Sequence, residues 1–266
     1  AGQPRRRLPD RHGDAPVLRV LVVGSAPEVI TPLRAAGLEY GKVYVHPFQH
    51  PTYYPGAQQM CVKLLYRKDG AILGVQAVGG EGVDVVVNVM ATAMQGGMSV
   101  YDLEQLELVY SPQWGSAKHA VNIAGFAAAN HLREDVALVY PDEAFSENAF
   151  LLDVRTPEEY SMGHIPGAVN IPVDSLSENL DAIPRDRLII TYCAVGLRGY
   201  VAARKLMLAG FQVSNLSGGF KLWSWVQVLR EASAALPQPA SVNDTATASA
   251  RLKVRKDSTF MVWAAF

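Results

Sequence analysis

The chain has 266 residues, of which 49% are hydrophobic, enough for one large or two modest domains with a buried core. Its 24 basic and 25 acidic residues leave a net charge of −1, which argues against a general nucleic-acid-binding or membrane-surface protein. Two cysteines, Cys61 and Cys193, are too few for a disulfide framework, and no apolar run reaches the roughly 18 residues of a membrane span. We therefore expect a cytoplasmic protein with reduced thiols.

The N-terminal stretch predicts little regular structure. Residues 1–16 are polar and rich in Pro, Gly and Arg, which indicates a disordered lead without a secretory signal. The apolar run at residues 17–23 predicts a strand, and residues 30–36 predict a short helical turn. Only Gly24 follows the strand, so the Gly-x-Gly-x-x-Gly fingerprint of a dinucleotide-binding fold is missing. Because the sequence has no initiator Met, we expect a fragment or a processed chain.

The pattern up to residue 135 is typical of an antiparallel sheet with flanking helices. Alternating apolar residues predict strands, and a turn ending in Asp69-Gly70 joins two of them into a hairpin. The strands are expected at residues 42–48, 61–66 and 71–78, with a further strand or extended piece at 106–110. Helices are expected at residues 82–95, after the N-cap Ser99, and at residues 120–132. We therefore assign residues 17–135 to an α+β domain.

The second half alternates strands and helices. The strands are expected at residues 150–154, 168–171, 188–192 and 213–216, and the helices near 157–160, 173–180, 199–209 and 218–229. This alternation predicts an α/β domain with a mainly parallel sheet, which we place at residues 140–229. Residues 230–266 are rich in Ala, Ser and Thr and predict a disordered tail.

Cys193 lies where a buried strand gives way to a helix. The first turn of a helix offers unpaired N–H groups and a positive dipole end, and Arg198 follows within that turn, so the thiolate form is favoured. The alternative is an inert thiol buried in the core. Cysteine phosphatases have one more residue in the corresponding loop than the Cys-x4-Arg found here. The shorter loop suits a sulfur atom better than a phosphate.

Three separated motifs in this half resemble the rhodanese family of sulfurtransferases. The active-site loop of that family is similar to Tyr192-Cys193-Ala194-Val195-Gly196-Leu197-Arg198. Its other signature resembles residues 151–160 and 163–172, and the third motif is at residues 216–223. The resemblance covers residues 144–227. It implies sulfur transfer from small sulfane-sulfur donors to thiol acceptors.

The residues around Cys193 have separate expected roles in sulfur transfer. Cys193 would attack a sulfane sulfur as a thiolate and carry it as a persulfide. Arg198 would stabilise the thiolate or orient an anionic donor, and Asp153 and Arg155 are expected to form an ion pair that shapes the site. A cradle of backbone N–H groups would hold the terminal sulfur. Its members are Ala194, Val195, Gly196, Leu197 and Gly199. No histidine shows metal-ligand spacing, so we expect no metal.

Residues 37–132 resemble the interface domain of the flavin-dependent pyridine-nucleotide disulfide oxidoreductases, in the coenzyme A-disulfide and persulfide reductase branch. The matching stretches are residues 42–47, 53–57, 72–79, 110–112 and 115–118. The resemblance implies a homodimer formed through residues 37–132. It also implies that Tyr54 and Tyr110 reach the partner subunit's active site.

The same family binds FAD and NAD(P)H in domains that precede the interface domain. Their glycine fingerprints and redox cysteine are missing here, so we expect the chain to bind neither cofactor by itself. The sequence then looks like the C-terminal part of a larger reductase, through truncation, a split gene or a shifted reading frame.

We therefore predict rhodanese-type sulfur transfer through Cys193. A first alternative is that the chain works as part of a coenzyme A-disulfide or persulfide reductase whose FAD and NAD(P)H domains are on another polypeptide. A second alternative is a non-catalytic dimerisation or binding module. Thiosulfate, glutathione persulfide and coenzyme A persulfide all remain open as donors.

Overall fold

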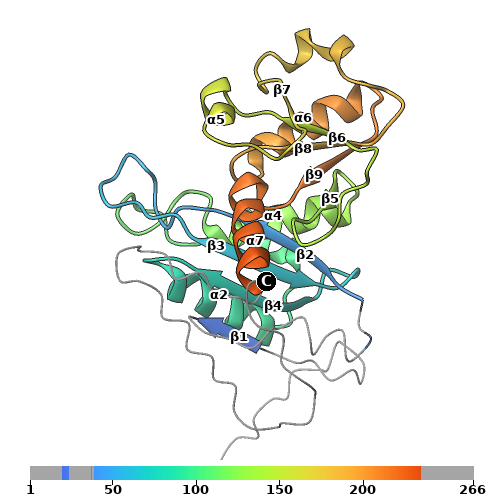
Figure 1. Cartoon of the computed structure of the whole chain (residues 1–266). Helices are drawn as coiled ribbons and strands as arrows, with labels where there is room; N and C mark the ends of the chain where they lie inside the picture. The colour runs from blue at the N-terminus through green and yellow to red at the C-terminus, as the bar shows by residue number, and fades with distance from the viewer. Residues whose placement is uncertain (1–19, 24–36, 38, 235–266) are drawn as a thin grey trace, which may run out of the picture. The chain divides into compact units, whose positions relative to one another are not determined.

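The computed structural model describes residues 20–23, 37 and 39–234, and the chain divides into two compact units, Ala1–Asp135 and Val136–Phe266 (Figure 1). The predicted disordered lead, the helical turn at residues 30–36 and the tail beyond Ala234 lie outside the described residues. No helix in the described part is long and apolar enough to cross a membrane.

The first unit is built on a four-stranded sheet. Its strands are β1 (Val20–Val23), β2 (Gly41–Val45), β3 (Cys61–Tyr66) and β4 (Ile72–Val78), in the order β1-β4-β3-β2. The predicted hairpin is present, with β3 antiparallel to both β2 and β4. β1 adds a parallel edge strand beside β4, a pairing that the sequence pattern does not predict.

The described part of the first unit also contains the helices α2 (Val83–Gln95), α3 (Val100–Glu104) and α4 (Ala120–Leu132). Ser99 and Asp102 form a capping box at the start of α3, which confirms the predicted N-cap. Residues 106–110, predicted as a strand or an extended piece, form no strand in the described chain, and an isolated bridge between Ser111 and Gly115 follows them.

The second unit contains a five-stranded sheet whose pairings are all parallel, which confirms the predicted α/β class. The strands are β5 (Ala137–Val139), β6 (Phe150–Asp153), β7 (Val169–Asn170), β8 (Ile189–Tyr192) and β9 (Val213–Leu216), in the order β5-β9-β8-β6-β7. β5 precedes residue 140 and pairs with β9, so this sheet starts earlier in the chain than the predicted domain. Every residue of the central strand β8 is buried.

The helices of the second unit are α5 (Pro157–Ser161), α6 (Leu197–Leu208) and α7 (Gly219–Ala234). The helix predicted at residues 173–180 is wrong, because two 3₁₀ turns, η1 (Leu176–Glu178) and η2 (Leu180–Ala182), take its place. Side chains there bind nearby carbonyls: Ser175 donates to Pro172 and Asn179 donates to Ser175, which competes with regular helix.

The predicted tail also begins too early. α7 continues through residues 230–234, where Arg, Glu and Ala are good helix formers.

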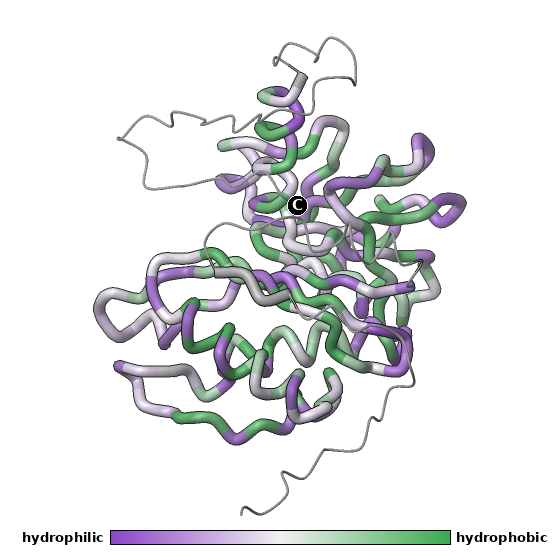
Figure 2. The backbone as a smooth tube through the Cα atoms, turned by 90° about the horizontal axis from the view of Figure 1, so that it is seen from below, coloured by the Kyte–Doolittle hydropathy of each residue, from purple (hydrophilic) through white to green (hydrophobic). Residues whose placement is uncertain are grey.

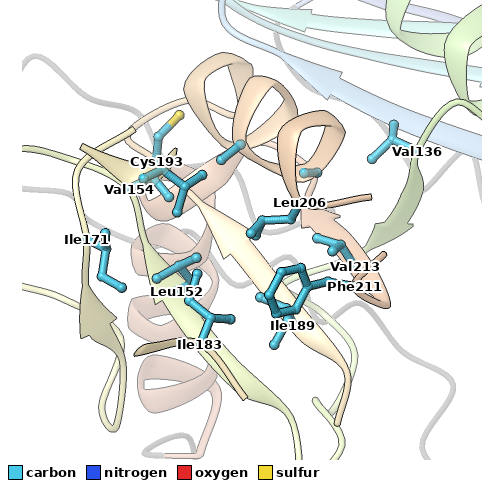
Figure 3. Close-up of a cluster of buried hydrophobic side chains, with 13 residues drawn as sticks. Val136, Leu152, Val154, Ile171, Ile183, Ile189, Cys193, Leu206, Phe211 and Val213 are labelled. Carbon is cyan, nitrogen blue, oxygen red and sulfur yellow. The ribbon is translucent and has the colours of Figure 1, made fainter. Parts of the chain in front are cut away.

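The core of the second unit is an apolar cluster between the sheet and α6 (Figure 3). It includes Leu152 of β6, Ile189 of β8 and Leu206 of α6, each fully buried. In Figure 3, Cys193 lies at one end of this cluster beside Val154. In Figure 2, green hydrophobic stretches alternate with purple hydrophilic stretches along the backbone tube. The core therefore fixes the end of β8 where Cys193 begins its loop.

Candidate functional site

Cys193 follows β8 at the carboxyl edge of the parallel sheet, which is where ligand sites of such sheets lie. The residue is 1% exposed, and its thiol is free. In Figure 3, its side chain lies at the end of the apolar cluster that faces this edge of the sheet. The sulfur is therefore held at the border between the core and the loop that follows.

The loop after Cys193 is fixed by the first turn of α7. The backbone N–H of Phe220 donates to the carbonyl of Cys193 at 2.8 Å, and that of Lys221 donates to the carbonyl of Ala194 at 2.9 Å. A trans peptide places C=O and the next N–H on opposite sides, so the N–H groups of Ala194 and Val195 point away from α7. α7 thereby sets the direction of the loop amides.

Gly219 makes this approach possible. A Cβ atom built at Gly219 would lie 2.5 Å from the carbonyl oxygen of Cys193 and 2.8 Å from the amide nitrogens of Val195 and Gly196. Its φ of +62° is in the left-handed region. Only glycine combines that conformation with such close backbone contact.

Gly196 carries the direct contact to the sulfur. Its N–H donates to Cys193 Sγ at 3.2 Å, and the residue is the N-cap of α6 with φ +106°. Asn215 Nδ2 donates to its carbonyl at 3.2 Å, and Thr191 Oγ1 donates to the carbonyl of Gly199 at 3.0 Å. The start of α6 is thus tied to β8 and β9. Its dipole favours negative charge at Sγ.

Arg198 lies in the first turn of α6 and pairs with Glu159 of α5. Both Nη atoms donate to the carboxylate at 2.7 Å. The hydrogen bonds from Arg198 lower the pKa of Glu159 to about 2, although partial burial opposes the shift. Hydrogen bonding to Glu159 raises the pKa of Arg198, and the charge and hydrogen bonding of the Cys193 sulfur add to this shift. The guanidinium therefore interacts with both the Glu159 carboxylate and the Cys193 sulfur.

Asp153 and Arg155 form a buried ion pair at the end of β6. Arg155 Nε lies 3.0 Å from both carboxylate oxygens, and Nη2 lies 2.6 Å from Oδ2. The two side chains are 0% and 5% exposed. Arg155 also donates to the carbonyl of Gly163 at 2.7 Å and stacks over the Phe220 ring at 4.3 Å. The pair thus joins β6, the turn after α5 and the start of α7.

The other members of the predicted cradle differ in exposure. Ala194 and Val195 are half-buried and Gly199 is buried, whereas Leu197 is 71% exposed. Of the predicted cradle groups, the N–H of Gly196 donates a hydrogen bond to Sγ. The loop is therefore open on the side of Leu197.

The two predicted tyrosines belong to the first unit. Tyr110 lies 3.4 Å, hydroxyl to hydroxyl, from Tyr53, and Tyr54 donates to Gln113 Oε1 at 3.5 Å. All three tyrosines are exposed. The hydroxyl partner of Tyr110 is thus Tyr53, while Tyr54 points to a different group.

Sequence reasoning missed two residues of the site, Glu159 and Gly219. Thr156 and Glu159 have the spacing of a capping box, which is present, and this pattern gives no hint of a partner 39 residues away. The Gly218-Gly219 pair is visible in the sequence, but its contact with the Cys193 loop depends on the sheet order β9-β8. Among the described residues, no three His, Cys, Asp or Glu side chains cluster as a metal site would require.

Comparison with known families matches the two units separately. Residues 141–224 match the rhodanese-like domain, and residues 20–120 match the pyridine nucleotide-disulphide oxidoreductase dimerisation domain. A sulfurtransferase from Allochromatium vinosum is 39% identical over 82 residues, covering 30% of this chain and 77% of the relative. A coenzyme A disulfide reductase from Staphylococcus epidermidis is 30% identical over 100 residues, covering 37% of this chain and 23% of that reductase.

Two solved structures resemble both units. Reduced CoADR-RHD from Bacillus anthracis is 41% identical, with a TM-score of 0.73, over 76% of this chain and 36% of that chain. A NAD-dependent persulfide reductase from A. fulgidus is 33% identical, with a TM-score of 0.66, over 72% of this chain and 35% of that chain. The chain thus spans about a third of each of these proteins. These matches confirm both resemblances: the chain belongs to the rhodanese family and joins its rhodanese-like domain to a pyridine nucleotide-disulphide oxidoreductase dimerisation domain.

Proposed function

We propose that this chain transfers sulfane sulfur through a persulfide on Cys193. The observation that carries the proposal is the hydrogen bond of 3.2 Å from the Gly196 N–H to Cys193 Sγ at the start of α6. A thiol that accepts a backbone N–H at a helix N-terminus is stabilised as the thiolate, the nucleophilic form. The similarity to a named sulfurtransferase supports the same chemistry.

In the first half-reaction, Cys193 Sγ attacks the outer sulfur of the donor. A new S–S bond forms to Sγ, and the donor's S–S bond breaks with its electron pair leaving on the inner sulfur. A persulfide donor RSSH thus gives a Cys193 persulfide and the thiolate RS⁻. In the second half-reaction, an acceptor thiolate attacks the outer sulfur, and Sγ leaves as a thiolate. No external oxidant or reductant is consumed.

The residues around Sγ have separable roles in this proposal. The amides of the loop from Ala194 to Gly199 hold the terminal sulfur, with the Gly196 N–H as the anchor. Arg198, which is shared with the Glu159 carboxylate, offsets part of the negative charge of the thiolate and of the persulfide. Asp153 and Arg155 hold the surrounding elements in place and do not react.

Intact-mass measurement after incubation with glutathione persulfide tests the proposal. We expect one added sulfur atom on the native chain, removed by cyanide, and none on Cys193→Ser. Cys61→Ala is the matched control, because Cys61 is the other cysteine and lies buried in β3 of the first unit. An adduct that persists in Cys193→Ser would contradict sulfur transfer through Cys193. No adduct on the native chain would also contradict it and would favour a non-catalytic binding module.

A second candidate function is favoured by the matches to coenzyme A disulfide reductase and to the NAD-dependent persulfide reductase. In this second function, Cys193 passes its sulfur to a redox cysteine in domains that bind FAD and NAD(P)H. The present chain does not fit these cofactors. Among the described residues, β1 pairs with β4 of the antiparallel hairpin and with no βαβ unit, and no Gly-x-Gly-x-x-Gly occurs in the given sequence. The absorption spectrum of the purified protein tests this candidate: a flavin band that copurifies would support it.

The dimerisation-domain match leads us to propose a homodimer formed through residues 37–132. Sedimentation velocity over a range of concentrations measures this directly. A chain that remains a monomer at tens of micromolar would contradict it.

A further inference from the structure

The positive charge beside Cys193 is already compensated in the folded protein. Both Nη atoms of Arg198 donate to the Glu159 carboxylate at 2.7 Å, a bidentate pair that uses the two terminal nitrogens of the guanidinium. The second arginine of this region, Arg155, is paired with Asp153 through Nε and Nη2. Both arginines beside the Cys193 loop are therefore already paired with a carboxylate in the folded protein.

Glu159 is held in this position independently of Arg198. The Thr156 N–H donates to Glu159 Oε2 at 3.0 Å, and the Glu159 N–H donates to Thr156 Oγ1 at 3.3 Å, which forms the capping box of α5. The carboxylate is therefore fixed by two elements at once. The Glu159 carboxylate can leave Arg198 and make room for a donor only if it also gives up the hydrogen bond from the Thr156 N–H.

We infer that Glu159 is a specificity-determining positioning residue, which holds and neutralises Arg198 and so directs the site away from dianionic sulfur donors and toward persulfides. This inference rests on the proposed sulfur transfer and names the residue that selects its donor. Glu159 acts through Arg198 and takes no part in the bond changes.

The two donor classes make different demands on the guanidinium. Attack of Sγ on the outer sulfur of thiosulfate breaks the S–S bond and releases sulfite, which leaves with the electron pair and two negative charges. That step requires an uncompensated cation near the leaving group. Attack on a persulfide RSSH releases RS⁻, which has one negative charge on sulfur. An Arg198 guanidinium that is already paired with Glu159 suffices to stabilise the thiolate released by a persulfide. It does not suffice to stabilise the sulfite released by thiosulfate.

Glu159→Gln separates charge from structure. Glutamine still supplies a side-chain oxygen that accepts the Thr156 N–H, so the capping box is retained while the negative charge is removed. Glu158→Gln is the matched control, because it makes the same change of charge one residue earlier, on an exposed side chain. Thr156→Ala is the structural control, since it loosens the cap and keeps the Glu159 charge.

The readout is the ratio of kcat/KM for thiosulfate to kcat/KM for glutathione persulfide. We expect Glu159→Gln to raise this ratio about tenfold, mainly through a lower KM for thiosulfate. Glu158→Gln and Thr156→Ala should leave it within about twofold. Glu159→Ala, which removes the cap acceptor too, should move the ratio in the same direction as Glu159→Gln.

An unchanged ratio in Glu159→Gln, or an equal loss for both donors, would show that Glu159 is only structural. Intact mass keeps this outcome apart from failure of the proposed function. A Cys193 persulfide on the native chain together with an unchanged ratio overturns the role of Glu159 alone. No adduct from either donor overturns both statements.

Discussion

Arg155 donates three side-chain hydrogen bonds to Asp153, two residues earlier, and both side chains are buried. The same guanidinium reaches the carbonyl of Gly163 and the ring of Phe220. One ion pair therefore connects three segments that surround the Cys193 loop: the end of β6, the turn after α5 and the first turn of α7.

Asp153→Ala should strongly destabilise the fold. It leaves the Arg155 guanidinium buried without its counter-charge, and breaking a buried pair in this way costs about 3–5 kcal/mol. Urea titration of the unfolding transition of the second unit measures the loss. Asp186→Ala is the control, because Asp186 pairs with Arg187 on the surface and should contribute less than about 1 kcal/mol. Equal losses in the two variants would argue against a structural role for the buried pair.

Gly219→Ala should disturb the sulfur site more than it disturbs the fold elsewhere. The added methyl group meets the backbone of Cys193, Val195 and Gly196, so the loop must shift. Overpacking of this kind costs about 1–3 kcal/mol, in addition to about 1 kcal/mol for the left-handed conformation. In the Gly219→Ala variant, the rate of persulfide formation on Cys193 should also fall, and intact mass measures that rate.

Gly210→Ala provides the comparison for this prediction. Gly210 has φ +84°, and a Cβ built there meets nothing within 4 Å, so only the conformational cost applies. We expect a loss of about 1 kcal/mol and an unchanged rate of persulfide formation. If Gly219→Ala also left that rate unchanged, α7 would not set the geometry of the loop.

The sequence carried enough information to predict most of the strands and helices and the position of Cys193. Local signals suffice for these features, since hydrophobic periodicity locates β8, and the helical pattern predicted at residues 199–209 locates α6, which begins at Leu197. Sequence also predicts that Asp153 and Arg155 lie close together, because they are two residues apart. The ion pair between them follows from burial at the end of β6.

Contacts between distant segments were not predictable in this way. Glu159 meets Arg198 because α5 and α6 both lie at the carboxyl edge of the sheet, and Gly219 meets the Cys193 loop because β8 and β9 are neighbours. Likewise, β1 precedes β2 in the chain, but in the sheet β1 pairs with β4, and the hairpin of β3 and β4 separates it from β2. Such contacts depend on strand order, which local pattern does not specify.

The Glu159 carboxylate should make stability depend on pH in the acid range. Its pKa of about 2 lies below the ordinary value of 4.5, so its contribution is fully present above about pH 5 and is lost as the pH falls from 4.5 toward 2. The pair is partly exposed, which limits this contribution to about 1 kcal/mol. The stability of the native chain should therefore exceed that of Glu159→Gln above pH 5, and the difference should shrink steadily as the pH falls toward 2.

Urea titrations of both proteins between pH 2 and pH 7 measure this difference. Glu178→Gln, which changes an exposed carboxylate of η1, should stay within about 0.5 kcal/mol of the native chain over the same range. A difference between native and Glu159→Gln that stays constant with pH would show that the Arg198 pair does not shift the titration of Glu159.

Arg198→Ala should slow the formation of the Cys193 persulfide by about ten- to a hundredfold, because it removes the cation beside Sγ and leaves the Glu159 charge uncompensated. The double variant Arg198→Ala, Glu159→Gln removes both charges and should recover part of that rate, since the two residues act as one unit. Arg187→Ala, on an exposed side chain, should react at the native rate. The rates come from quenched samples analysed by intact mass. Strict additivity of the two single changes would mean that Glu159 and Arg198 influence the sulfur separately, whereas the bidentate contact predicts that they do so together.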